Sequence, residues 1–490
     1  MNSFRPARSG SAPTTGPAPV GGPASTTGPS RRSVLRAAAV GLAAPALAGC
    51  VTSGGDDGQP AAAKGETSAD NPLGVPASTP LEVVVFDGGY GDEYATNAES
   101  IYKGRFPGAT VDHKAIQKVG EALQPRFVAD TPPDVVDNTG AGRLDLATLV
   151  AAGKLTDLTE LLDAPSLDDP GTKVRDTLLP GVVADGTLDG KVYTLNFTYT
   201  VWGLWYSKPL FDRHGWAYPT NWDAMLALCD QIKKAGVAPW TYQGKYPEYL
   251  NDPLLAMAAK AGGPELVQAV DNLQPGAWKQ QPLLDAATAI AELAGRGYLL
   301  PGSEALSHTE AQAAWSQGKV AFIPCGSWLE AEQQGVTPAG FDMVMGAVPS
   351  LGAADKLPYG TIQAASSESF LVPARAKNPR GGLEFLRVLF SSGSARRFAE
   401  LNSTLPSVAG ATDGLTVSTG LGSVRAAVQA AGPNTVTYRF RTWYAPLAKA
   451  VDDATGELAT RRITPGQWAD RIQKAADAVA ADSAVKKYTR

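Results

Sequence analysis

Three histidines, His113, His214 and His308, are the first residues to consider for catalysis or metal binding. They are widely separated, and the chain has neither an HExxH motif nor a Cys/His cluster at metal-ligand spacing, which argues against zinc chemistry. No Gly-x-Ser-x-Gly elbow occurs, so a serine hydrolase is disfavoured. Segment 186–192 resembles a phosphate loop but lacks a Ser or Thr after its lysine, and we interpret it as a turn before a strand. The sequence therefore predicts no metal and no cofactor.

The thiol of Cys50 is the reactive group with the most informative neighbours. Leu47-Ala48-Gly49-Cys50 resembles a bacterial lipobox, in which small residues admit the peptidase and the thiol accepts a diacylglycerol. Upstream, Arg31-Arg32 begins a segment similar to the twin-arginine export signal, followed by the apolar stretch 37–48, which is too short to span a bilayer. The alternative is that Arg31 and Arg32 are ordinary basic residues before a general signal peptide. The protein would then still be exported, by a different route.

These motifs predict how the chain begins and where it is located. We expect residues 1–49 to be a lipoprotein signal peptide and residues 50–80 to be a flexible tether, because the latter have no hydrophobic periodicity. The protein is then exported and lipid-anchored to the outer face of the cytoplasmic membrane. Of the other two cysteines, Cys229 falls on the apolar face of an expected helix and Cys325 at a strand end. We favour buried free thiols, with a disulfide as the alternative.

Composition limits the class of protein and its partners. With 490 residues, of which 44% are hydrophobic and 19% charged, the chain can bury one large or two medium cores, and we favour two domains. The first 49 residues contain five arginines and no lysine or acidic residue, so removing them changes the formal charge from −5 to −10. An acidic surface repels phosphate backbones, so we expect no nucleic-acid binding and a partner that is uncharged or small.

The elements that would position a site alternate between strands and helices from residue 81 onward. Strands are expected at 81–86, 110–114 and 134–137, with a helix ending near Phe106 and another at 120–129. This βαβαβ pattern predicts an α/β fold with mostly parallel sheets, whose ligands bind beyond the carboxyl ends of the strands. Farther along, segment 220–223 has capping-box spacing before an amphipathic helix, and residues 467–482 form a final helix.

Several motifs in this body, by their order and spacing, resemble one family. They are Gly190-Lys191-Val192-Tyr193-Thr194-Leu195, Trp205-Tyr206-Ser207-Lys208-Pro209-Leu210-Phe211, Pro219-Thr220-Asn221-Trp222-Asp223, Gly318-Lys319-Val320-Ala321-Phe322 and Gly326-Ser327-Trp328. The chain is similar to the extracellular sugar-binding proteins of ABC importers, although Asn221 stands where the family usually has Thr. With its lipobox start it also looks like the N-acetylglucosamine- and diacetylchitobiose-binding lipoproteins of Gram-positive bacteria.

The resemblance implies a two-lobe, periplasmic-binding-protein-like α/β fold with a hinge and a ligand cleft between the lobes. Lobe 1 would comprise residues 81–197 plus 349–406, and lobe 2 residues 201–348 plus 407–490. Hinge closure around ligand would then supply much of the affinity. The implied partners are a small oligosaccharide, two membrane permease subunits and the membrane through the lipid anchor. We expect a monomer without enzymatic activity.

A sugar ring offers C–H faces to aromatic side chains and hydroxyls to polar ones, and this chemistry selects the candidate site. All ten tryptophans follow residue 201, and the family places stacking aromatics where Tyr249, Trp328 and Trp443 occur. Other candidates follow expected strands or the expected hinge crossing. The predicted substrate-binding residues are Asp87, Tyr90, Asn138, Thr139, Phe197, Tyr199, Tyr249, Trp328, Glu368 and Trp443.

Core packing is the alternative role for each of these aromatics, and turn formation is the alternative for Asn138. At the level of the whole protein, a secreted glycoside hydrolase is the main alternative, because such enzymes also place aromatics around a pair of carboxylates. A third hypothesis keeps the two-lobe fold and replaces the sugar with a peptide or another polar solute. Assays of hydrolysis and of competition between sugars and peptides would separate the three.

Overall fold

The computed structural model describes residues 64–490, apart from residues 141, 180 and 334. The predicted signal peptide, Cys50 and the first part of the tether lie outside the described residues. The tether prediction is wrong at its C-terminal end, because Leu73 and Val75 are buried in a hydrophobic core. The Asn378 amide also donates to the carbonyl of Pro80 at 3.1 Å, which holds this segment against the folded body.

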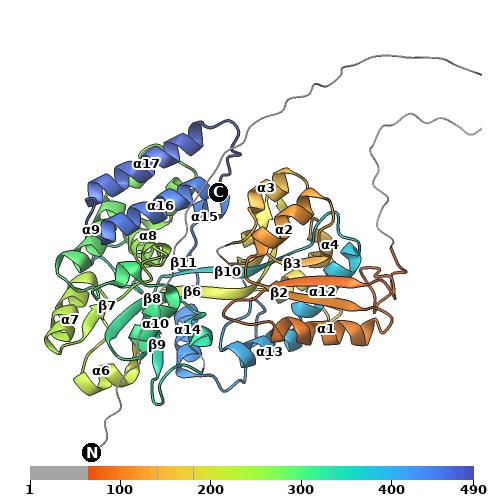
Figure 1. Cartoon of the computed structure of the whole chain (residues 1–490), viewed down its shortest axis with the longest axis horizontal. Helices are drawn as coiled ribbons and strands as arrows, with labels where there is room; N and C mark the ends of the chain where they lie inside the picture. Colours follow the sequence, from red (N-terminus) through yellow and green to blue (C-terminus); the bar gives the residue numbers. More distant parts are fainter. Residues whose placement is uncertain (1–63, 141, 180, 334) are drawn as a thin grey trace, which may run out of the picture. The chain divides into compact units, whose positions relative to one another are not determined.

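Within the described residues, a nine-stranded sheet has the order β2-β1-β3-β10-β6-β8-β7, with β11 beside β10 and β9 beside β6 (Figure 1). Its strands are β1 Leu81–Phe86, β2 Val111–Ile116, β3 Val135–Asp137, β6 Leu195–Ser207, β7 Ala238–Trp240, β8 Val320–Gly326, β9 Met343–Gly346, β10 Ile362–Leu371 and β11 Thr435–Val436. The sheet is mixed, so the expectation of mostly parallel strands is wrong. β1 pairs in parallel with β2 and β3, whereas β6 and β10, which run in opposite directions, pair antiparallel.

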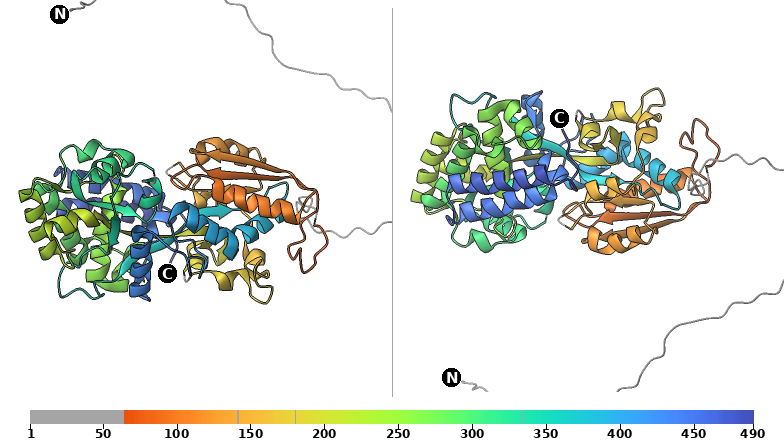
Figure 2. Two further views of the ribbon diagram at one scale, coloured as in Figure 1. Left: turned by 90° about the horizontal axis from the view of Figure 1, so that it is seen from below. Right: turned by 90° about the horizontal axis from the view of Figure 1, so that it is seen from above.

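The βαβαβ unit predicted from the sequence is confirmed, with strand and helix ends within a few residues of those expected. Alternation along β1 sends Val83 and Val85 into one core and Val84 into another, and helices cover both faces of these strands (Figure 2). The helices associated with this part are α1 Glu93–Arg105, α2 Val119–Val128, α3 Leu146–Ala151, α4 Thr159–Asp163, α5 Val182–Asp185, α12 Pro379–Leu389 and α13 Ser392–Asn402. Segment 186–192 forms the hairpin of β4 Thr187–Leu188 and β5 Lys191–Val192, so its interpretation as a turn is confirmed.

The remaining helices divide between two cores: those at residues 308–316, 329–332 and 419–431 pack into the same core as Val83 and Val85, and the others build a second core around β7 and β8. All of these helices together are α6 Lys208–His214, α7 Trp222–Lys234, α8 Glu248–Asp271, α9 Gln281–Gly295, α10 His308–Ser316, α11 Leu329–Glu332, α14 Thr419–Ala431, α15 Phe440–Trp443, α16 Ala445–Ala459 and α17 Pro465–Ala481. Helix α7 is capped by Asn221, whose side chain accepts from the Ala224 amide, so the capping box expected from Thr220 is wrong. Helix α8 changes direction at Gly263, whose φ of 75° favours glycine.

The predicted lobe boundaries remain a proposal, with one change. Leu351 and Leu357 pack against the second core, although the segment from residue 349 was assigned to lobe 1. The return crossing therefore falls at β10, because that strand pairs with β6 over most of its length.

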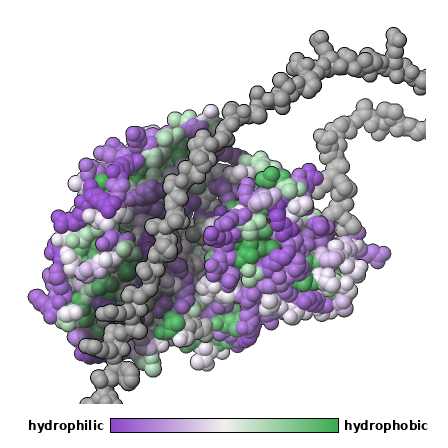
Figure 3. All heavy atoms as spheres, viewed as in Figure 1, coloured by the Kyte–Doolittle hydropathy of each residue, from purple (hydrophilic) through white to green (hydrophobic). Residues whose placement is uncertain are grey.

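Both Cys229 and Cys325 are buried free thiols, which confirms the preferred interpretation over a disulfide. Hydrophilic residues predominate on the face shown in Figure 3, and apolar residues form small separate groups. Among the described residues, Val128 and Val336 are the large hydrophobic side chains that stand exposed. In the same part of the chain, no helix has the length and apolar character needed to cross a membrane.

Candidate functional site

Five residues from four separate segments lie together, and we call them the five-residue cluster. Its members are Trp202, Tyr249, Asp252, Trp328 and Gln363. The rings of Trp202 and Trp328 lie nearly perpendicular with centroids 6.3 Å apart, and Tyr249 approaches Trp328 at 6.2 Å. Gln363 Nε2 donates to Asp252 Oδ1 at 3.1 Å, which links the polar half of the cluster.

The elements explain why these residues meet. Gln363 of β10 is paired directly with Trp202 of β6, and residues opposite each other in a sheet place their side chains on the same face. Asp252 follows Tyr249 by three residues on α8, so both lie on one side of that helix. Trp328 comes just after β8, and its ring covers Gly326 so closely that a Cβ there would lie 2.0 Å from it. Gly326 therefore permits this position of the ring.

The electrostatics of the cluster centre on Asp252, which is partly exposed. Burial is the largest cause that raises the pKa of its carboxyl to about 7, and the nearby carboxylates of Glu248 and Asp452 act in the same direction. Arg441 opposes them, and it forms an ion pair with Asp452 at 3.0 Å. Burial similarly raises the pKa of the Tyr249 hydroxyl, so this phenol stays protonated and can donate. The cluster thus combines flat apolar rings with donors and acceptors.

Three of the predicted residues converge on a second group at the carboxyl ends of β1 and β3. The Thr139 hydroxyl donates to the Asp137 carboxylate and accepts from the Ser369 amide at 2.9 Å. Burial and then the adjacent Asp137 carboxylate raise the pKa of Glu368. The Tyr90 hydroxyl is buried without a hydrogen-bond partner among the described residues, and burial followed by the charge of Glu368 raises its pKa.

The first loop and the five-residue cluster share a neighbour. A Cβ on Gly89 would lie 2.7 Å from the Glu332 side chain, which places the loop after β1 against α11. The charge of Glu332 also acts on the hydroxyls of both Tyr90 and Tyr249. These contacts bring the loop after β1 close to the aromatic residues around β8.

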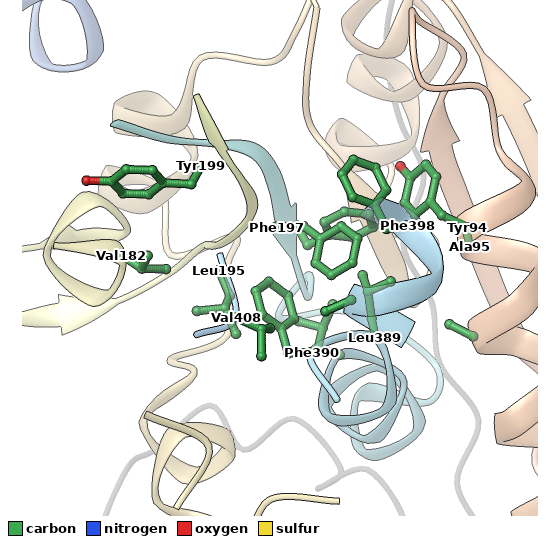
Figure 4. Close-up of a cluster of buried hydrophobic side chains, with 14 of the residues drawn as sticks. Tyr94, Ala95, Val182, Leu195, Phe197, Tyr199, Leu389, Phe390, Phe398 and Val408 are labelled. Atoms are coloured by element: carbon green, nitrogen blue, oxygen red, sulfur yellow. The ribbon is translucent and has the colours of Figure 1, made fainter. Parts of the chain in front are cut away.

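The predictions for Phe197 and Tyr199 are wrong. Phe197 is 0% exposed, with its ring 5.0 Å from Phe398 and stacked 5.8 Å from Tyr94, and Figure 4 shows it pointing into this apolar cluster. Tyr199 is also buried, and Figure 4 shows its ring extending away from the Phe197 group. Because side chains alternate along β6, these odd-numbered positions face away from Trp202.

The other predicted residues have different environments. Asn138 is 2% exposed, and its side chain both donates to the Leu144 carbonyl and accepts from the Leu144 amide, so the turn alternative is confirmed and the binding role is wrong. Asp87 is exposed directly after β1 and remains a prediction. Trp443 stacks on Tyr488 with centroids 5.5 Å apart, so one face of its ring is already covered by the chain itself.

Trp202, Asp252 and Gln363 were missed by the sequence analysis. Side chains alternate between the two faces of a strand, so the correct register of β6 would have identified Trp202. Residues three apart share one side of a helix, so the position of Tyr249 would have identified Asp252. Nothing local distinguishes Gln363, whose role depends on the strand pairing. A separate cavity of about 500 Å³ is lined by Tyr206, Phe211, Trp216 and Tyr218 together with α14, and it contains none of the predicted binding residues.

The fold and the aromatic–polar cluster define a binding protein for small solutes, and the comparisons with known proteins agree. A model of the bacterial extracellular solute-binding proteins matches residues 87–396, and the chain belongs to this exported family. The diacetylchitobiose binding protein NgcE of Streptomyces coelicolor is 33% identical over 468 residues, covering 93% of this chain and 97% of that protein.

Solved structures establish the two-lobe fold. A chitin oligosaccharide binding protein aligns with a TM-score of 0.64 and 23% identity, covering 79% of this chain and 93% of that chain. RafE in complex with raffinose aligns with a TM-score of 0.63 and 19% identity, covering 81% of this chain and 99% of that chain. The predicted fold class and family are therefore confirmed.

Proposed function

We propose that this protein captures N-acetylglucosamine or its β-linked dimer, diacetylchitobiose, outside the cell and delivers it to the two permease subunits of an ABC importer. The five-residue cluster is the observation that carries the proposal. Three aromatic rings offer apolar faces for the C–H surfaces of a sugar, and the hydrogen-bonded pair of Asp252 and Gln363 places polar groups beside them. The resemblance to NgcE over nearly the whole chain supports the choice of sugar.

The experiment is isothermal titration of the chain from residue 51 onward with N-acetylglucosamine, diacetylchitobiose, maltose and xylobiose in parallel. Saturable heat from the first two sugars alone is the expected result. Heat from only maltose or xylobiose would preserve sugar transport and overturn the proposed substrate. Heat from none of the four would argue against the proposed function.

The proposal includes twin-arginine export, lipid attachment at Cys50 and a monomeric protein that acts without catalysis. The motifs around Arg31-Arg32 and Cys50 support the first two parts. Replacing Cys50→Ala should move the protein from the membrane fraction to the medium, and retention in the membrane fraction would contradict the anchor. Incubation of the purified protein with chitooligosaccharides should release no product, since steady release would favour the glycoside hydrolase instead.

A further inference from the structure

The carboxyl of Asp252 has an unusual environment for an acidic side chain at a helix start. It is partly exposed, and among the residues that the structure describes it forms no ion pair. Its carboxylate accepts one hydrogen bond within the described residues, from the uncharged amide of Gln363, and that bond occupies one of the two carboxylate oxygens. A carboxylate in a partly desolvated position is costly unless donors satisfy both oxygens. The second oxygen is therefore open to a donor supplied from outside.

The orientation of the Gln363 amide supports an ionised carboxylate at the same place. Its side chain is 6% exposed, and while Nε2 donates to Asp252, Oε1 finds no donor in the described part of the chain. A buried carbonyl without a partner costs about 1–3 kcal/mol, so this orientation of the amide needs a reason. The carboxylate supplies it, because an ionised carboxylate can only accept and so selects Nε2 as the atom that faces it.

The surroundings indicate what kind of molecule would meet the open oxygen. Tyr249 lies on the same side of α8 as Asp252, and its ring packs against Trp328, which in turn contacts Trp202. Trp202 is the direct cross-strand neighbour of Gln363. A ligand at this position would present an apolar ring face to the aromatics and an O–H or N–H group to the carboxylate.

We propose that Asp252 binds the sugar directly, its free carboxylate oxygen accepting a hydroxyl or acetamide proton, and that Gln363 is the positioning residue that holds this carboxylate. The proposal rests on the proposed function, since it assigns a role within the same site. The protein then binds its ligand in the form in which Asp252 is ionised. Protonation of this one group removes the acceptor and weakens binding.

The charges that face Asp252 define the expected pH range. Glu248 and Asp452 raise its pKa, Arg441 and the hydrogen bond from Gln363 lower it, and with burial the pKa is about 7. If only the ionised form binds, the dissociation constant rises about 30-fold between pH 8 and pH 5.5. Removing the Gln363 donor leaves the ionised form less stabilised, so the midpoint of this change should move to higher pH.

The test is titration calorimetry with diacetylchitobiose at pH 8, 7, 6 and 5.5 on the chain from residue 51 and on three variants. Asp252→Asn should bind more weakly at pH 8, by about 10- to 100-fold, and lose most of the pH dependence because the titrating acceptor is gone. Gln363→Met should bind more weakly with the midpoint displaced upward. Asp285→Asn is the matched control, because this exposed carboxylate also accepts from a glutamine, Gln281, at 2.7 Å. It should behave as the unmodified chain.

The outcomes separate the inference from the function on which it rests. Absence of sugar binding by the unmodified chain at every pH would remove the proposed function itself. Tight binding with a pH profile that Asp252→Asn leaves unchanged would keep the function and overturn the role of Asp252. A Gln363→Met variant that weakens binding without moving the midpoint would overturn the positioning role. Circular dichroism of each variant confirms that the fold is intact.

Discussion

Replacing Asp252→Asn should stabilise the folded protein at neutral and alkaline pH while weakening its binding. The carboxyl has a pKa of about 7 in the folded chain against 3.8 for an ordinary aspartate. A folded-state pKa above the unfolded value means that the native state binds the proton more tightly, so stability from this group is present at low pH and is lost as pH rises through 7. The full difference corresponds to about 4 kcal/mol above pH 7, an upper limit because solvent reaches part of the side chain.

The assay is urea denaturation of the chain from residue 51 and of the Asp252→Asn variant at pH 8 and pH 4. Asparagine keeps the Oδ1 acceptor for Gln363 Nε2 and cannot ionise, so the variant should gain free energy of unfolding at pH 8, up to about 4 kcal/mol, and almost nothing at pH 4. Asp285→Asn serves as the exposed control and should change little at either pH. A variant that is equally stable or less stable than the unmodified chain at both pH values would refute the reasoning.

Three further predictions concern other residues. Trp328→Ala should weaken sugar binding by about 1–3 kcal/mol in calorimetry. The control Trp216→Ala alters a partly buried tryptophan outside the cluster and should leave the affinity unchanged. Equal losses of affinity in the two variants would contradict the assignment of Trp328 to the sugar site. Phe197→Ala should lower the free energy of unfolding by about 3–5 kcal/mol in urea titrations and leave the affinity of the folded fraction intact. Burial lowers the pKa of Lys260 to about 7. The free energy of unfolding of the unmodified chain, measured relative to Lys260→Met, should therefore rise by about 1 kcal/mol per pH unit between pH 7 and pH 9. A difference that does not change with pH would contradict the lowered pKa.

Local sequence pattern was sufficient to predict the strands and helices of the βαβαβ unit. The apolar run at β1, the glycine loop after it and the periodicity of α1 depend on neighbours within a few residues, so their ends were predicted closely. The same reasoning located Cys229 on the buried side of α7, because a period of 3.6 residues defines one face. Tyr249 and Trp328 were selected through a family resemblance, and the structure brings their rings together.

Sequence by itself determined the α/β class, the family, and the residue types that a sugar site needs. Tertiary structure decided which of those residues share a face. β6 is buried at nearly every position, so its sequence pattern does not reveal that Phe197 enters the core and Trp202 faces the cluster. That choice follows from the register between β6 and β10, which also sets Gln363 beside Trp202. A one-residue shift in that register would reverse every side chain, and only contacts between segments distant in sequence select the correct one.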